Sequence, residues 1–285
     1  MSPDPGTAIE NVGAAAIAAK YFGASVGRIL GPTADYLGGE LQEWTEKRAE
    51  NVGRIFRNAE RKLGPEGLKS DGSVPPRVLG AILSEGQFRD DALAADYLGG
   101  VLASAKTEDG RDDRGAALVA LVSRLSTYQL RAHYMLYAQA RNALAGRDLN
   151  LGEQSVRKTN VLFLPMADFL AGMDFSNAEM VDFAGVLSHV VHGLIREGLL
   201  EDEFRYGGPS ALGSMTSGPD FRPMGGILFR ITPLGIELFM MAHGLGRGHP
   251  MSTYVDSRVN LEFDTSVAVS TAGLVADLPR IQPPE

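Results

Sequence analysis

The stretch Ala95-Asp96-Tyr97-Leu98-Gly99-Gly100 repeats, letter for letter, the earlier stretch Ala34-Asp35-Tyr36-Leu37-Gly38-Gly39. A leucine follows two positions after each copy, and both copies lie among helix-forming residues. Because small residues let two helix backbones approach closely, each copy predicts a packing seam between helices, with Tyr36 and Tyr97 as anchors. The flanks diverge at once, so we interpret the copies as two seams in one helical domain, and the function must lie elsewhere.

The composition is that of a globular protein with an adequate core. The chain has 285 residues, of which 44% are hydrophobic and 22% are charged, enough for one large domain or two ordinary ones. A net charge of −8 argues against nucleic-acid binding by the whole surface, although a local basic patch remains compatible with it. The chain has no cysteine, which excludes disulfides, zinc–thiolate sites and cysteine nucleophiles and suits a reducing cytoplasm.

The first thirty residues predict a helix rich in glycine and alanine. Thr7-Ala8-Ile9-Glu10 forms a capping box, and the helix is expected to run to Leu30. Charged residues interrupt the apolar stretch, which is therefore not a convincing membrane span, and no secretion signal precedes it. We expect this helix to pack within the chain or an oligomer in the cytoplasm. Attachment to the inner membrane, or insertion on activation, is the alternative.

The N-terminal half predicts a helical bundle domain over residues 1–146. Gly64-Pro65 ends a long amphipathic helix, Asp90 or Asp91 caps the helix that carries the second repeat, and Ser126 caps another. Short connections indicate that successive helices are antiparallel neighbours. The expected helices cover residues 33–63, 90–105, 114–124 and 127–145.

The pattern changes over residues 150–248. Ser176-Asn177-Ala178-Glu179 is a second capping box, which opens a helix expected to continue through Arg196. Strand candidates at 202–206 and 227–231 flank a loop rich in Gly, Pro and Ser, and a last helix begins at Thr232-Pro233. This order predicts a winged-helix-like domain, with residues 166–171 as the first helix of its helix-turn-helix and a small β-hairpin as its wing. We expect residues 249–285 to be an extended or partly disordered tail.

Several sequence blocks together resemble a known bacterial family. They are "LGPTADYLGGELQEW" (30–44), "VPPRVLGAILSEGQFRDDALAADYLGGVLASA" (74–105), "LIREGLLE" (194–201) and "FRITPLGIELF" (229–239). The chain is similar, over residues 8–244, to the abortive-infection alpha family of small helical proteins associated with defence against phage. The resemblance implies a defence role and supplies no catalytic residues. Tyr97 stands where many members have tryptophan, the loop before Gly226 is unusually long, and the tail after Gly248 is not part of the pattern.

The helix that ends at Arg196 carries the first candidate site. Ser188, His189, His192 and Arg196 lie away from its apolar stripe and could reach a groove edge of DNA or a protein partner. Three further arginines could meet phosphates: Arg205, Arg222 and Arg230. Acidic residues crowd the same end, which favours protein packing or dimerisation over nucleic-acid binding. His189 and His192 share a face, but no further ligand signature accompanies them, so no metal is expected.

A second candidate surface is the basic face of the long amphipathic helix. Its interaction candidates are Lys47, Arg54, Arg57 and Arg61. Interspersed glutamates favour a solvated face laced with ion pairs at i,i+3 and i,i+4 spacing. A surface for RNA, an acidic partner or anionic lipid is the alternative.

No motif indicates an enzyme. The chain has no G-x-S-x-G elbow, P-loop or dinucleotide fingerprint, and its adjacent carboxylates lie where caps and turns are expected. We therefore expect a non-enzymatic protein without cofactor or small-molecule substrate. Its partner is a phage component or a second copy of the chain, and a DNA-binding regulator or a membrane-surface effector is the alternative.

Overall fold

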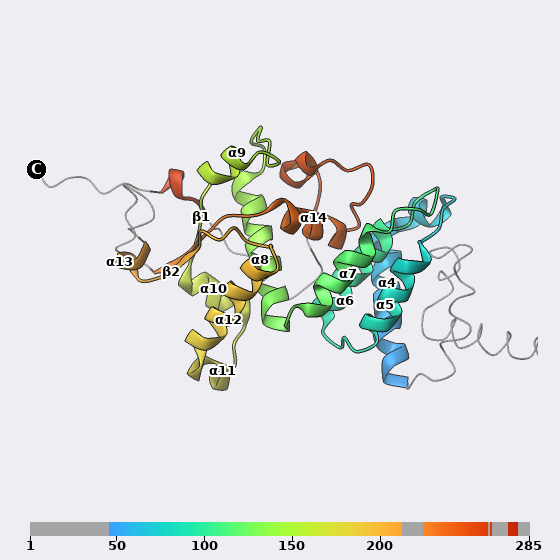
Figure 1. Ribbon diagram of the computed structural model, residues 1–285, viewed down its shortest axis with the longest axis horizontal. Helices are drawn as coiled ribbons and strands as arrows, with labels where there is room; N and C mark the ends of the chain where they lie inside the picture. Colours follow the sequence, from blue (N-terminus) through green and yellow to red (C-terminus); the bar gives the residue numbers. More distant parts are fainter. Residues whose placement is uncertain (1–45, 213–224, 262, 264–272, 279–285) are drawn as a thin grey trace, which may run out of the picture. The chain divides into compact units, whose positions relative to one another are not determined.

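The computed structural model describes residues 46–212, 225–261, 263 and 273–278 (Figure 1). It is mainly helical with a small antiparallel sheet, which confirms the coarse fold class. The chain divides into two compact units: a first of residues up to Arg124 with Met240–Gly248, and a second of Leu125–Phe239 with the residues from His249 on. The domain boundary expected at 146 lies one helix later than this division. No helix in the described ranges is long and apolar enough to cross a membrane.

The first unit is a set of helices packed side by side: α4 (Glu46–Lys69), α5 (Pro76–Gly86), α6 (Ala92–Ser104) and α7 (Arg114–Arg124) (Figure 1). Helix α4 packs on α6, and α5 and α6 both pack on α7. Gly64 has non-helical backbone angles (φ 61°, ψ 179°), so the range α4 consists of two helical segments that meet at a kink, and the first segment ends at the predicted Gly64-Pro65 pair. The predicted start near residue 33 lies outside the described residues.

Helix α6 is the core of the first unit, and it carries the second copy of the repeat. The Asp91 carboxylate accepts from the Ala94 amide at 2.8 Å, which confirms one of the two predicted caps. Tyr97 is fully buried. A Cβ built on Gly99 would lie 2.8 Å from the Ile55 carbonyl oxygen, and one on Gly100 would lie 1.7 Å from that of Ala242. This copy is therefore a packing seam, whereas the copy at 34–39 lies outside the described residues.

The second unit begins with the long helix α8 (Thr127–Leu144), whose N-cap Ser126 forms the full capping box with Gln129. The elements that follow are α9 (Gln154–Thr159), β1 (Leu162–Pro165), α10 (Met166–Met173), α11 (Asn177–Val181), α12 (Phe183–Arg196), β2 (Arg205–Gly207), α13 (Pro209–Leu212), β3 (Gly226–Phe229) and α14 (Pro233–Ala242). The predicted Ser176–Glu179 capping box is present. The single helix expected after it is split at Asp182, whose backbone is not helical (φ −109°, ψ 29°). Asp and Gly185 are both weak helix formers, which explains the break.

A four-stranded sheet with order β2-β3-β1-β4 closes the second unit. Strand β3 pairs antiparallel with β2 (Tyr206↔Ile227), which confirms the predicted hairpin. The other edge of β3 pairs with β1 (Leu162↔Phe229), and β4 (Gly273–Leu274) adds to the far edge of β1. No strand was predicted for the β1 segment from the sequence alone.

The segment after residue 248 differs from the extended tail that we expected. Met251–Val255 forms the 3-10 helix η3, and Val275–Asp277 forms η4 after β4. Tyr254 is fully buried, its hydroxyl donates to the Tyr137 carbonyl oxygen at 2.5 Å, and its ring meets Phe239 edge-on at 5.7 Å. These contacts place one aromatic residue of the tail in the core of the second unit.

Candidate functional site

Helix α12 brings its four predicted site residues to one side. It buries Leu187, Val190, Val191 and Leu194 on the opposite stripe. His189, His192 and Arg196 are exposed and Ser188 is half-buried. We call these four residues the α12 face. Their spacing follows the helical period, so the periodicity of the sequence was enough to predict that they share one side of the helix.

His189 is engaged with helix α8. Its Nε2 lies 3.0 Å from the hydroxyl oxygen of Ser126, the residue that caps α8. The backbone carbonyl of His189 accepts from the Gln129 side-chain amide at 3.1 Å. This histidine therefore fixes α12 against the start of α8, a role that the sequence did not indicate. Among the described residues, no group of three or more His, Cys, Asp or Glu side chains is arranged to hold a metal ion.

The arginines near α12 are accompanied by carboxylates. Arg196 donates to Glu197 at 3.2 Å, and Arg230 forms an ion pair with Glu203. The Arg230 side chain is only 12% exposed, so it cannot reach far into solvent. Arg205 is exposed on β2, and Arg222 lies outside the described residues. The positive charge expected to meet phosphates is thus largely compensated within the protein.

Two exposed apolar side chains lie on the element that precedes α12. Val181 is 88% exposed and Met180 is 42% exposed, both at the end of the short helix α11. We call this pair together with the α12 face the α11–α12 surface. Their exposure was not predictable from the sequence, because a five-residue helix shows no periodicity that separates buried from exposed positions.

Helix α11 is fixed to α8 through Glu179. The Glu179 carboxylate accepts from the Ser176 amide at 2.8 Å and from the Tyr128 hydroxyl in a very short hydrogen bond. Hydrogen bonds from Ser176 and then Tyr128 lower the pKa of Glu179 to about 2, and the same carboxylate raises the pKa of the Tyr128 phenol. The Tyr128 ring also lies 5.9 Å from that of Phe175. Met180 and Val181 therefore belong to a helix that hydrogen bonds fix to α8.

In the first unit, the predicted basic residues lie along one side of α4. Lys47, Arg57 and Arg61 are exposed and Arg54 is half-buried. Arg54 donates to the Asp90 carbonyl oxygen at 2.7 Å, and Arg61 forms an ion pair with Asp96 of α6 at 2.5 Å. These residues are brought together as predicted, with partners that come from α6 and the turn before it.

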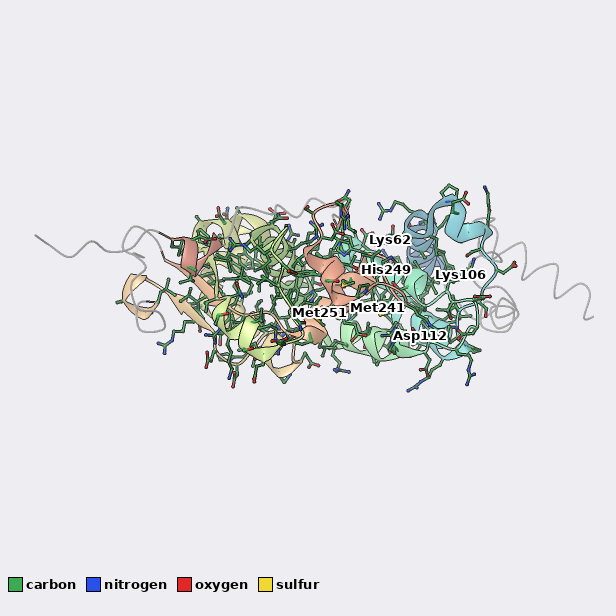
Figure 2. All side chains as sticks on the ribbon, turned by 90° about the horizontal axis from the view of Figure 1, so that it is seen from above. Lys62, Lys106, Asp112, Met241, His249 and Met251 are labelled. Atoms are coloured by element: carbon green, nitrogen blue, oxygen red, sulfur yellow. The ribbon has the colours of Figure 1, made fainter. Side chains whose placement is uncertain are left out.

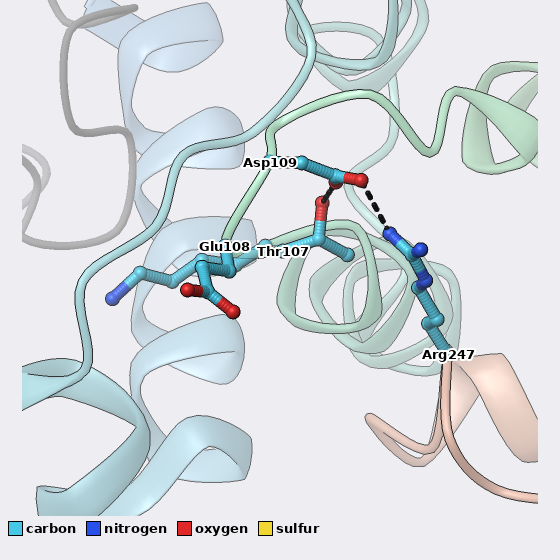
Figure 3. A pocket seen from close by; sticks show the side chains of 5 residues that line it. Thr107, Glu108, Asp109 and Arg247 are labelled. Carbon is cyan, nitrogen blue, oxygen red and sulfur yellow. Dashed lines mark hydrogen bonds and ion pairs between the residues drawn. The ribbon is translucent and has the colours of Figure 1, made fainter.

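A polar hollow of about 720 Å³ lies elsewhere in the first unit, lined by Lys106, Thr107, Glu108, Asp109 and Arg247 (Figure 3). Arg247 donates to Asp109 at 2.7 Å, and this hydrogen bond lowers the pKa of Asp109 to about 2. Lys106, labelled in Figure 2, donates at 2.9 Å to the carbonyl oxygens of Gly67 and Ser70. Lys106 and Arg247 thus bind groups of the chain itself and hold the loops of this unit together. The hollow therefore offers a ligand little positive charge.

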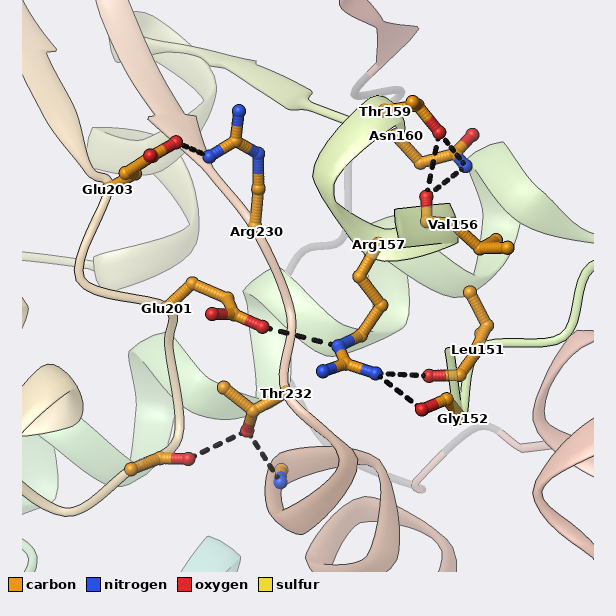
Figure 4. A network of polar contacts seen from close by, with 12 residues as sticks. Leu151, Gly152, Val156, Arg157, Thr159, Asn160, Glu201, Glu203, Arg230 and Thr232 are labelled. Atoms are coloured by element: carbon orange, nitrogen blue, oxygen red, sulfur yellow. Dashed lines mark hydrogen bonds and ion pairs between the residues drawn. The ribbon is translucent and has the colours of Figure 1, made fainter. Parts of the chain in front are cut away.

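The second unit contains a buried polar network that the sequence did not reveal (Figure 4). Arg157 is 8% exposed and donates to Glu201 at 3.2 Å and to the carbonyl oxygens of Leu151 and Gly152 at 2.8 and 3.0 Å. Thr232 caps α14 by accepting from the Gly235 amide at 3.1 Å. The polar groups of this network are hydrogen-bonded to one another, which indicates a structural role.

Comparison with known proteins gives no relative from which a role could be transferred. The chain matches no protein-family model, no curated protein and no solved structure.

Proposed function

We propose that this chain is a non-enzymatic protein that acts by binding another protein through the α11–α12 surface. The partner is a phage component or a second copy of the chain, and the role is the phage defence that the family resemblance implies, in the cytoplasm or at the inner membrane. The observation that carries the proposal is the exposed pair Met180 and Val181, held on a helix that is anchored to α8.

In this proposal the second unit is a winged-helix-like module. Helix α12 takes the place of the recognition helix, α10 precedes it in the helix-turn-helix, and β2 and β3 form the wing. The support is the element order α8, α9, β1, α10, α11, α12, β2, α13, β3, α14, together with the pairing of β1 with β3. Such a module can present its exposed helix to a nucleic acid or to a protein.

The character of the surface favours a protein partner. Exposed apolar side chains next to polar ones are typical of the centre and rim of a protein interface. DNA binding draws most of its affinity from several lysines and arginines that neutralise phosphates. Here Arg196 and Arg230 are paired with Glu197 and Glu203, so few positive charges remain for a phosphate backbone.

A plaque assay with matched variants tests this proposal. Val181→Asp places a charge on this surface without disturbing the core, because Val181 is 88% exposed. We expect it to abolish phage protection, whereas Ala276→Asp, at an exposed position of η4, should protect like wild type. Light scattering of the purified variants then separates loss of self-association from loss of a different partner. Equal phage protection by Val181→Asp and Ala276→Asp would contradict the proposed role of the α11–α12 surface.

The alternative is a DNA-binding regulator that uses the same module. The exposed His192 and Arg196 of α12 favour it. It predicts salt-dependent DNA binding that Arg196→Ala and Arg230→Ala abolish. Protection that survives these two changes but fails on deletion of residues 7–30 would instead favour a defence effector, and binding to anionic liposomes would favour the membrane-surface role.

A further inference from the structure

A continuous basic stripe runs along α4 in the first unit. Lys47, Arg54, Arg57 and Arg61 are separated by one or two helical turns, and Glu50 is the single carboxylate at these positions of the helix. Arg61 is also ion-paired with Asp96 of α6 at 2.5 Å, so the positive charge is strongest over the other three cations. These five positions follow one another at intervals of three and four residues, so they lie on one face over about 21 Å of helix. We call them the α4 stripe. On a chain with a net charge of −8, it is a local region of positive charge.

An exposed aromatic ring borders the N-terminal half of the stripe. Phe88 lies in the turn between α5 and α6 and is 64% exposed. The guanidinium carbon of Arg48, the residue next to Lys47, lies 4.8 Å from the centre of the Phe88 ring. One face of the ring is thus covered by a cation, and most of the side chain is open to solvent.

The turn that carries Phe88 is fixed to α4 on both sides of the ring. The Asn51 side-chain amide donates to the Gln87 carbonyl oxygen at 3.0 Å, and Arg54 donates to that of Asp90 at 2.7 Å. Arg89 donates to the Val122 carbonyl oxygen of α7 at 3.1 Å. Because residues on either side of Phe88 are hydrogen-bonded, the exposed ring is held next to the stripe.

We propose that the α4 stripe and Phe88 form a binding surface for single-stranded nucleic acid. Arginine binds phosphate oxygens with its planar fork of donors, and a row of cations along a helix can follow a sugar–phosphate backbone. An aromatic ring exposed beside such a row is a platform on which an unpaired base can stack. A base in a duplex is already stacked on both faces, which is why the ring points to a single strand.

A membrane surface fits the same region less well. A helix that lies on a membrane buries a row of apolar side chains among the lipids, in addition to its basic residues. Of the large apolar side chains that are strongly exposed in the described residues, Phe88 alone belongs to the first unit. The observations therefore favour an anion that combines phosphates with aromatic bases.

Fluorescence anisotropy with labelled oligouridylate and oligothymidylate of about 12 nucleotides tests the proposal. This length lies within the roughly 4–16 nucleotides that one small single-strand-binding domain covers. Full-length wild type should bind at low salt. Arg57→Gln should weaken binding several-fold and reduce the slope of log affinity against log salt by about 0.7, the value for one phosphate contact on a single strand. Phe88→Leu should weaken binding by about tenfold through loss of stacking, and Phe88→Tyr should retain it.

The matched control is Arg111→Gln, which removes an exposed arginine of the same unit away from the stripe. It should bind like wild type, and thermal unfolding should show all four variants folded. The proposal is overturned if wild type binds neither oligonucleotide at low salt, if Arg57→Gln and Arg111→Gln weaken binding equally, or if Phe88→Leu has no effect. Binding to phosphatidylserine vesicles without oligonucleotide binding would overturn it in favour of a membrane surface.

Discussion

Lys62 of α4 holds Asp96 of α6 by two hydrogen bonds from one ammonium group. Its Nζ donates to the Asp96 carboxylate at 3.0 Å and to the Asp96 carbonyl oxygen at 2.7 Å (Lys62 is labelled in Figure 2). The Lys62 side chain is 9% exposed, so this charge lies largely inside the first unit. Because Asp96 belongs to the repeated sequence, the pair joins the packing seam to the long basic helix.

Burial of Lys62 predicts that stability rises on the alkaline side of neutrality. Desolvation lowers the pKa of Lys62 from 10.5 to about 8, although Asp96 opposes this shift. Between these two values the unfolded chain keeps the proton and the folded chain loses it. The unfolded state then binds more protons, so the free energy of unfolding contributed by this group increases from about pH 8 toward pH 10. Urea unfolding at several pH values measures the effect.

Lys62→Met is the variant for this measurement, and Lys69→Met is its control at an exposed position. The alkaline rise should shrink in Lys62→Met and persist in Lys69→Met. The comparison ends near pH 10, because tyrosines ionise in the unfolded chain above that value, while burial raises the pKa of Tyr137 and Tyr254 in the folded state. Parallel curves for wild type and Lys62→Met would contradict the prediction.

The close approach of α6 to Ala242 predicts that one methyl group added at Gly100 lowers the free energy of unfolding strongly. In Gly100→Ala the new Cβ would collide with the backbone of Ala242, which cannot move aside as a flexible side chain could. We expect a loss of about 3 kcal/mol in unfolding free energy. Gly80→Ala, on the exposed side of α5 with nothing within 4 Å, should instead be neutral or add about 0.5–1 kcal/mol. Chemical denaturation of the two variants makes the comparison.

His133 predicts a loss of stability under mild acid. Complete burial lowers the pKa of His133 from 6.5 to about 3, against a smaller opposing effect of a backbone hydrogen bond with Gly235. As the pH falls below 6.5, the unfolded chain takes up a proton that the folded chain does not, so stability decreases. His133→Phe, which keeps an aromatic ring against Tyr137, should show a shallower decrease between about pH 6.5 and pH 5, where carboxylates remain ionised. An unchanged slope of the unfolding midpoint against pH would be the contrary result.

The buried network around Arg157 predicts that the free energy of unfolding depends strongly on the Arg157 side chain. Arg157→Met leaves Glu201, 20% exposed, without its partner and two carbonyl oxygens without a donor. Removal of one partner from a buried ion pair costs about 3 kcal/mol or more. Arg147→Met breaks an exposed pair with Asp277 and should cost less than about 1 kcal/mol. Thermal unfolding distinguishes them, and similar costs would show that the network contributes little.

Features encoded within four residues were predicted well from the sequence. The caps at Asp91, Ser126 and Ser176 are correct, because each depends on a side chain and an amide three residues later. The buried and exposed sides of α12 follow from its periodicity in the same way. The glycines of the second repeat lie in a seam, because a side chain at Gly99 or Gly100 would meet the backbone of a neighbouring helix.

Features that join distant residues were not predicted. The partner of Lys62 is Asp96, 34 residues away, so no local pattern reveals the pair. His189 is exposed, as its position on the helix predicted, but its contact with Ser126, 63 residues earlier, has no local signal in the sequence. The strand at Leu162–Pro165 depends on pairing with Gly226–Phe229, which no local pattern of four apolar residues reveals. The sequence thus predicted which residues share a helix face, and it did not predict their partners within the protein.

The two-residue strand β4 has a consequence for how the chain can be shortened. Gly273 and Leu274 pair with Phe163 and Leu162, and so cover the outer edge of β1. An uncovered strand edge offers unpaired amides and carbonyls to any other extended chain. A protein truncated before residue 273 would display that apolar edge, and we expect it to aggregate at concentrations where the full chain remains in solution. The end of the chain therefore protects the sheet against edge-to-edge association.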